Sequence, residues 1–150
     1  MEKITSELAG VKTAAIAGHV RPDGDCVGSC MGLYLYLKEN YPEIEADVYL
    51  EEVKEGFSFL NSIHDVKNQL DENKIYDVIF ILDTSVKDRV GVVASALDTA
   101  KKTICIDHHI SNKGFADIDV ICPSASSASE LLYTLLEEKK VTKSCAEAIY

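Results

Sequence analysis

The sequence has no apolar run long enough to cross a membrane, which takes about 20 consecutive apolar residues. Its first residues, Met-Glu-Lys-Ile-Thr-Ser, also lack the apolar core of a secretory signal. We therefore expect neither membrane association nor export.

Paired cysteine motifs are absent as well. The five cysteines are an odd number, and none forms a Cys-x-x-Cys pair. Most of them stand among apolar residues, where a thiol behaves as a small core side chain. This usage predicts reduced thiols and a cytoplasmic setting.

Basic residues are scarce: the sequence has 15 Lys and Arg but 25 Asp and Glu, which gives a net charge of −10. A broad nucleic-acid-binding face needs clustered Lys and Arg, so this balance argues against one. An anionic substrate would have to be small, or be held mainly at bound cations. A dinucleotide-cofactor domain is also disfavoured, because no Gly-x-Gly-x-x-Gly follows the first predicted strand.

What the sequence does contain is an alternation of apolar strands and helices in 150 residues, the length of one domain. Strands are expected at 13–18, 46–50, 77–82, 103–106 and 118–122. Helices are expected at 27–37, 92–100, 128–136 and from 144 onward. This order predicts an α/β fold with a mostly parallel, Rossmann-like sheet flanked by helices.

Local signals refine the helices. Gly28 and Gly32 would let the first helix lie close to the sheet. Ser127-x-x-Glu130 is the pattern of a capping box, and Ser144-x-x-Glu147 is the same pattern for the last helix.

Acids and histidines gather where the predicted strands end. The set is His19, Asp23, Asp25, Asp83, Asp107, His108 and His109. The carboxyl ends of parallel strands share one edge of the sheet, where ligands bind. Imidazole and carboxylate ligands suit Mn²⁺, Mg²⁺ or Zn²⁺. So many groups exceed the needs of one ion, and two ions about 3.5–4 Å apart suit hydrolysis of a phosphoester.

Each part of this set has a simpler interpretation by itself. The His19–Asp25 stretch could be a loop with polar caps, and Asp83 could be a helix N-cap. His108 or His109 could be a core histidine with ordinary partners, and His64 is interpreted as a surface residue. Their joint location at strand ends favours the metal site.

The motifs resemble those of the DHH phosphoesterase family. They are Gly18-His19-x-x-Pro22-Asp23-Gly24-Asp25-x-x-Gly28-Ser29, then Asp83, Asp107-His108-His109-x-x-Asn112, and the serine-rich run 124–130. They are most similar to the RecJ-like branch, which includes bacterial nano-RNases (oligoribonucleases and pAp phosphatases) and cyclic-dinucleotide phosphodiesterases. The resemblance covers nearly the whole chain.

The resemblance implies two divalent metal ions, with Mn²⁺ the first expectation and Mg²⁺ or Co²⁺ the alternatives. His19 and Asp23 would hold one ion, Asp25 and His108 the other, and Asp83 both. The catalytic residues would be His109, facing the scissile phosphate, and Asp107, orienting an imidazole.

Arg89, Asn112 and Ser126 are candidate substrate contacts. For Arg89, an ordinary exposed arginine is the simpler interpretation.

The implied activity is two-metal hydrolysis of short oligonucleotides, 3′-phosphoadenosine 5′-phosphate (pAp), or linear or cyclic dinucleotides. An inorganic pyrophosphatase and a single-strand DNA exonuclease are alternatives within the family. The family's fourth motif and its C-terminal substrate-binding domain would follow Tyr150. We therefore expect residues 1–150 to form a DHH domain that is incomplete at its C-terminus. A metal- or nucleotide-binding module without hydrolysis, and assembly as a homodimer, both stay open.

Overall fold

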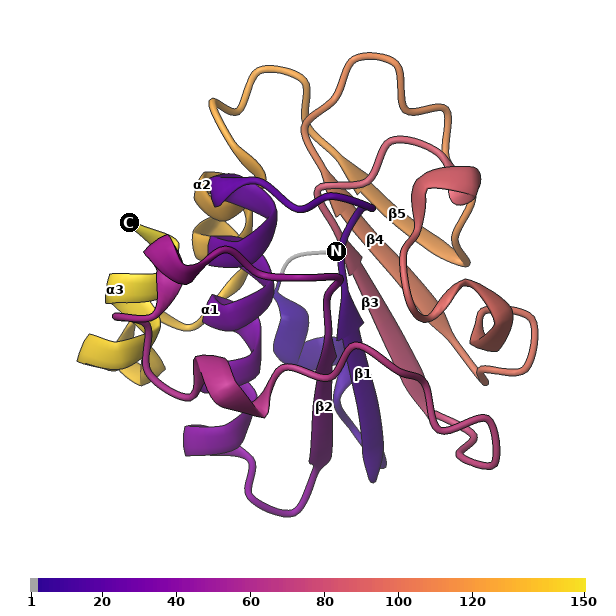
Figure 1. The fold of residues 1–150 in the computed structure, drawn as a ribbon, viewed down its shortest axis with the longest axis horizontal. Helices are drawn as coiled ribbons and strands as arrows, with labels where there is room; N and C mark the ends of the chain where they lie inside the picture. Colours follow the sequence, from indigo (N-terminus) through magenta and orange to yellow (C-terminus); the bar gives the residue numbers. More distant parts are fainter. Residues whose placement is uncertain (1–2) are drawn as a thin grey trace.

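A computed structural model describes residues 3–150 as a five-stranded sheet with the order β2-β1-β3-β4-β5 (Figure 1). Every pairing between neighbouring strands is parallel. The strands are β1 (Thr13–Ala17), β2 (Glu45–Tyr49), β3 (Val78–Leu82), β4 (Thr103–Asp107) and β5 (Ile118–Ile121). The predicted α/β fold is confirmed.

Three α-helices pack together on one face of the sheet (Figure 1). They are α1 (Gly24–Asn40), α2 (Ala128–Leu135) and α3 (Lys143–Ile149). The other face is covered by short 3₁₀ turns, Lys87–Arg89 and Ala94–Ala96, and by the residues around them. None of the described helices is both long and apolar enough to span a bilayer.

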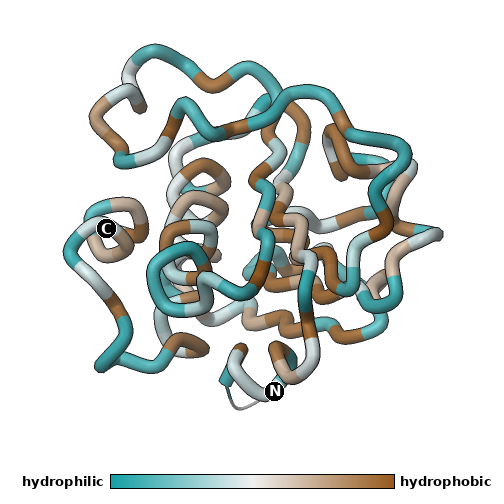
Figure 2. Tube along the Cα trace, turned by 90° about the horizontal axis from the view of Figure 1, so that it is seen from below, coloured by the Kyte–Doolittle hydropathy of each residue, from teal (hydrophilic) through white to brown (hydrophobic). Residues whose placement is uncertain are grey.

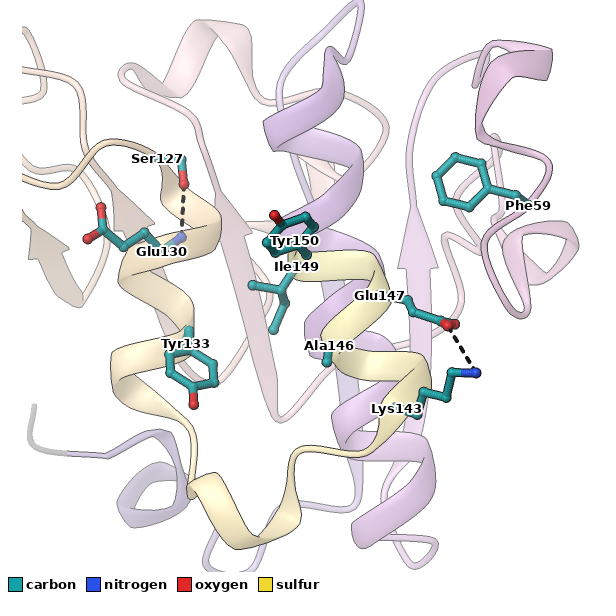
Figure 3. A pocket seen from close by; sticks show the side chains of 9 residues that line it. All are labelled: Phe59, Ser127, Glu130, Tyr133, Lys143, Ala146, Glu147, Ile149 and Tyr150. Atoms are coloured by element: carbon teal, nitrogen blue, oxygen red, sulfur yellow. Dashed lines mark hydrogen bonds and ion pairs between the residues drawn. The ribbon is translucent and has the colours of Figure 1, made fainter.

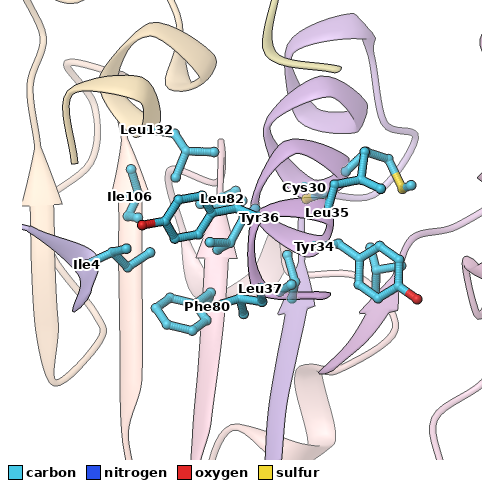
Figure 4. Packing of buried hydrophobic residues seen from close by; sticks show 14 of the residues in the cluster. Ile4, Cys30, Tyr34, Leu35, Tyr36, Leu37, Phe80, Leu82, Ile106 and Leu132 are labelled. Atoms are coloured by element: carbon cyan, nitrogen blue, oxygen red, sulfur yellow. The ribbon is translucent and has the colours of Figure 1, made fainter. Parts of the chain in front are cut away.

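The three central strands are largely apolar because both faces of the sheet are covered there, whereas the edge strands β2 and β5 also carry acidic residues. Along β3, Val78, Phe80 and Leu82 face the helices, while Ile79 and Ile81 face the 3₁₀ turns. Figure 4 shows Phe80 and Leu82 packed among side chains from α1, α2 and β4. In Figure 2 the hydrophobic stretches lie mainly along the strands and α1, and the hydrophilic ones along the connecting loops.

Helix α1 is buried on all sides from Cys26 to Leu37, because it lies between the sheet and α3. A helix that is apolar all round is expected for such a position. It begins three residues earlier than predicted, where the Asp23 side chain accepts a hydrogen bond from the Cys26 amide. Asp25 and Cys26 are therefore in its first turn.

The helix predicted at 92–100 is wrong, since only Ala94–Ala96 forms a 3₁₀ turn there. The preceding residues are tied to the loop after β1: the Val20 amide donates to the Arg89 carbonyl, and the Gly91 amide to the Gly18 carbonyl. From Gly91 onward the backbone closes mostly i to i−3 hydrogen bonds, which place Val90, Val93 and Ala96 on the sheet. At the other end the Lys101 amide donates to the Tyr76 carbonyl, so anchoring at both ends overrides the helical pattern.

The two helical glycines face a different element from the one expected. A Cβ atom on Gly28 would lie 2.6 Å from the Ala148 carbonyl oxygen, and one on Gly32 would lie 2.5 Å from the Ile149 side chain. They bring α1 close to α3, not to the sheet.

The caps of the last two helices also differ in part from their predictions. Ser127 caps α2 by accepting from the Glu130 amide (Figure 3), as expected. The Glu130 carboxylate, however, reaches the amide and hydroxyl of Ser126. Helix α3 is capped by Thr142, which accepts from the Cys145 amide, and not by Ser144.

The glycine contact yields a stability prediction. We expect Gly28→Ala to lower the free energy of unfolding by about 1–2 kcal/mol, because overpacking against a backbone carbonyl outweighs the roughly 1 kcal/mol gain in helix propensity. Gly56→Ala, with no atom within 4 Å of the new methyl group, is the matched control and should change little. Urea unfolding measures both, and a stabilised Gly28→Ala protein would contradict this packing.

Candidate metal centre

The acidic and imidazole side chains lie at the carboxyl edge of the sheet, the upper edge in Figure 1. In this strand order the chain leaves β1 toward β2 on one side and returns to place β3 on the other. Such a switch point opens a crevice outside the strand ends. His19 follows β1, Asp83 follows β3, and His108 and His109 follow β4, so the predicted convergence is present.

Asp83 is at the centre of this group and is 2% exposed. Its Oδ2 atom lies 3.5 Å from Nε2 of His19. Its Oδ1 atom lies 3.6 Å from Nε2 of His108 and 3.6 Å from Nδ1 of His109. One carboxylate therefore faces three imidazoles from two other strand ends.

Two features of Asp83 are unfavourable for stability. Its φ of 52° is in the left-handed region, which costs a non-glycine residue about 1–2 kcal/mol. Its buried Oδ1 atom has no hydrogen-bond partner among residues 3–150, a further cost of about 1–3 kcal/mol. The Asp83 amide nevertheless donates to the Ile106 carbonyl, which holds the residue against β4. A cation would satisfy the unpartnered oxygen.

His19 and Asp23 complete one side of the centre. Nδ1 of His19 lies 2.8 Å from the Val20 carbonyl oxygen, so Nδ1 carries the proton and Nε2 faces Asp83. Asp23 is largely exposed, and its Oδ1 atom lies 3.8 Å from Nε2 of His19. The same oxygen caps α1, so the helix start fixes where this carboxylate points.

Asp25 and His108 form the other side, with 3.6 Å between Asp25 Oδ2 and His108 Nε2. The Asp25 carboxylate also accepts from the amides of Ala128 and Ser129 at the start of α2, at 2.7 and 2.9 Å. Each carboxylate oxygen has a second lone pair, so both oxygens can still accept another ligand. The five predicted metal ligands thus form a continuous series: Asp23, His19, Asp83, His108 and Asp25.

The His109 ring is held by Asp107. Its Nδ1 atom donates to Oδ1 of the fully buried Asp107 at 2.7 Å. The other oxygen of Asp107 accepts from the side-chain amide of Asn112 at 2.8 Å.

Asn112 is itself buried, and its Oδ1 atom accepts from the Gly114 amide. The structure therefore places Asn112 behind Asp107, where it supports the His109 ring, and not on an open substrate-binding face.

The remaining predicted contacts lie at the rim. Arg89 is exposed, and its carbonyl holds the loop that carries His19 and Val20. Ser126 is exposed and bonded to Glu130, one residue after Ala125, whose carbonyl lies 3.3 Å from Nδ1 of His108. His64 is exposed, as expected for a surface residue.

Cys26 is the functional candidate that sequence reasoning missed. A ligand atom from each of His19, Cys26 and Asp83 lies within 4.8 Å of the others. A second such group consists of Asp83, His108 and His109. The sequence predicted core positions for most of the cysteines, and only the place of Cys26 directly after Asp25 indicated a different role. Asp83 belongs to both groups, so nitrogen, oxygen and sulfur donors surround two candidate cation positions.

Burial and neighbouring charges perturb this centre. Burial, followed by the Asp25 charge, raises the pKa of Asp83 to about 7. The hydrogen bond with Cys26 is the main cause that raises the pKa of His19 to about 9. The hydrogen bond with Cys30 is the main cause that lowers the pKa of Cys26. Perturbed groups concentrated in one crevice are typical of a functional site.

A separate hollow of about 910 Å³ lies between α2, α3 and Phe59 (Figure 3). Its lining includes Tyr133, Ile149 and Tyr150 but none of the strand-end acids and histidines. It is not the metal centre.

The raised pKa of Asp83 predicts that the free energy of unfolding of the metal-free protein depends on pH. Between about pH 4 and pH 7 the folded state keeps a proton on Asp83 that the unfolded chain has lost, so stability falls as the pH rises. We expect Asp83→Asn to be more stable than wild type at pH 8, by up to about 4 kcal/mol. The difference should nearly vanish at pH 4.

Urea unfolding in the presence of a chelator measures this difference. Asp88→Asn, which changes an exposed aspartate nearby, is the control. A wild-type protein more stable than Asp83→Asn at pH 8 would contradict the interpretation.

A family profile and several known proteins match this chain. The profile described as "DHH family, N-terminal domain" matches residues 13–150. The bifunctional oligoribonuclease and PAP phosphatase NrnA of Bacillus subtilis is 34% identical over 144 residues, which are 92% of this chain and 44% of that protein. The probable enzyme of the same name in Streptococcus mutans is 26% identical over 151 residues, covering 98% of this chain and 46% of that protein.

The fold has a solved counterpart. The crystal structure of an exopolyphosphatase-related protein from Bacteroides fragilis superposes with a TM-score of 0.83 at 25% identity, over 97% of this chain and 46% of that one. The chain thus spans less than half the length of each of these relatives. The chain belongs to the DHH family, in which it matches the N-terminal domain.

Proposed function

We propose that this chain is a metal-dependent phosphoesterase whose substrates are short oligoribonucleotides, pAp, or linear or cyclic dinucleotides. The observation that carries the proposal is the buried Asp83 carboxylate, which faces imidazoles on both sides and leaves one oxygen without a hydrogen bond among residues 3–150. Its two oxygens face different groups, which suits a ligand shared by two ions.

In this proposal His19 and Asp23 would hold one ion, Asp25 and His108 would hold the other, and Asp83 would contribute to both. When bound, two divalent ions polarise the phosphoryl group and neutralise the charge that develops during hydrolysis. Mn²⁺ is the first candidate, and Mg²⁺ and Co²⁺ are the alternatives. Carboxylate and imidazole donors accommodate all three.

His109 and Asp107 act on the substrate side. Asp107 fixes the His109 ring through Nδ1, which leaves Nε2 free to donate a hydrogen bond to a phosphate oxygen when the ring is protonated. Asn112 holds Asp107 from behind and is a positioning residue. This arrangement sets the direction of the ring before substrate arrives, which lowers the entropic cost of catalysis.

Two considerations support the choice of substrates. The names of the relatives from Bacillus subtilis and Streptococcus mutans describe oligoribonuclease and PAP phosphatase activities. The net charge of −10 disfavours a long polyanion, whereas a short substrate can be held at the ions and His109. Arg89 and Ser126 are proposed as contacts at the rim, and a homodimer as the assembly.

A nucleotide-binding module without turnover is the second candidate. Both oxygens of Asp25 already accept backbone amides of α2, which weakens this carboxylate as a ligand. A loosely held second ion would leave binding intact and hydrolysis slow.

Hydrolysis of a short RNA and of pAp in excess Mn²⁺ tests the proposal. We expect Asp83→Ala and His108→Ala each to lower the rate at least about 100-fold, since loss of even an outer-shell group typically costs 10- to 100-fold. Asp88→Ala and His64→Ala, at exposed positions, are the matched controls and should keep full activity.

Two results would contradict the enzyme proposal. Unchanged hydrolysis in Asp83→Ala would mean that another site is responsible. Tight binding of pAp without any turnover by wild-type protein would favour the binding module.

A further inference from the structure

The side chain of Cys26 is completely buried in the first turn of α1. Its sulfur belongs to the group formed with His19 and Asp83, in which the three ligand atoms lie within 4.8 Å of one another. The companion group of Asp83, His108 and His109 offers only nitrogen and oxygen atoms. The two candidate cation positions therefore differ in chemistry.

The Cys26 thiol packs directly against the backbone of Gly18. A Cβ atom on Gly18 would lie 2.1 Å from Sγ of Cys26, so the thiol occupies the space that the missing side chain leaves. Gly18 directly precedes His19, and the chain around it is fixed by the hydrogen bond between the Gly91 amide and the Gly18 carbonyl. The sulfur is held next to the imidazole by the backbone of the loop after β1.

The Asp83 carboxylate is a second observation that points to a ligand between these groups. It is 2% exposed, and its Oδ2 atom lies 3.5 Å from Nε2 of His19. Its Oδ1 atom, on the side of His108 and His109, has no hydrogen-bond partner within residues 3–150, so the protein alone does not satisfy this buried carboxylate. The hydrogen bonds of His19 leave Nε2 facing Asp83. A nitrogen, an oxygen and a sulfur atom thus converge from three elements on a buried point.

We propose that Cys26 contributes its sulfur to the cation position formed by His19 and Asp83. The thiol proton is released to solvent as the ion binds, as for other cysteine ligands. Thiolate ligands select softer ions, so this position favours Zn²⁺, Co²⁺ or Cd²⁺ over Mg²⁺ and Mn²⁺. The companion position, without sulfur, keeps the ordinary preference of carboxylate and imidazole. The inference rests on the metal centre proposed above and adds a selectivity to it.

Titration of the metal-free protein with Co²⁺ tests the inference directly. Ligand-field bands in the visible region report that Co²⁺ is bound, and a sulfur-to-cobalt charge-transfer band in the near ultraviolet reports a thiolate ligand. We expect wild-type protein to show both, and Cys26→Ser to keep the visible bands and lose the charge-transfer band.

Two other cysteines provide controls. Cys145→Ser changes a buried thiol bonded to the Gly32 carbonyl, and Cys122→Ser removes a half-exposed thiol that could bind cobalt adventitiously. Both variants should keep the charge-transfer band. In competition experiments we expect Cys26→Ser to bind Cd²⁺ at least about tenfold more weakly, with Mn²⁺ affinity changed less than about threefold.

The wild-type spectrum alone can overturn the inference. Visible bands without a charge-transfer band would show that cobalt binds and that Cys26 is not a ligand, while the proposed metal centre stands. A complete absence of bound cobalt would contradict both the Cys26 ligand and the proposed metal centre. Loss of the charge-transfer band in Cys122→Ser, with the band retained in Cys26→Ser, would assign the sulfur to the surface.

Discussion

The structure depends on one buried carboxylate that is not fully satisfied by the protein. Asp83 directly follows the central strand β3 in a left-handed conformation, with imidazoles facing both of its oxygens. Neither its backbone conformation nor its unpartnered oxygen stabilises the fold. Features of this kind persist where the surrounding structure holds them in place, and they concentrate at functional sites. A positively charged ligand is the simplest compensation.

The fold places the partners of Asp83 directly after the strands or at the start of α1. Parallel strands with apolar faces on both sides bring β1, β3 and β4 together, and their polar ends follow at the same edge. Asp25 then connects this edge to the helical layer, because it faces His108 and also accepts the first amides of α2. The packing of α1 against α2 and α3 is therefore part of what positions the ligands.

Much of this arrangement could be predicted from the sequence. The strands are short apolar runs that end in ionisable residues, and both signals are local. Three features could not be predicted in this way. The segment 92–100 has a helical composition, yet the residues just before it are tied to the loop after β1, and Lys101 just after it is bonded to Tyr76. Gly28 and Gly32 serve contacts with α3, an element more than 100 residues away. Cys26 reaches the centre only because Gly18 leaves room for it.

The most direct test of the central claim is crystallography with Mn²⁺, using anomalous scattering at the manganese absorption edge. The account predicts two anomalous peaks on opposite sides of the Asp83 carboxylate, one beside His19 and one beside His108. A single peak, or peaks that do not contact Asp83, would contradict the claim that this carboxylate is shared by two ions.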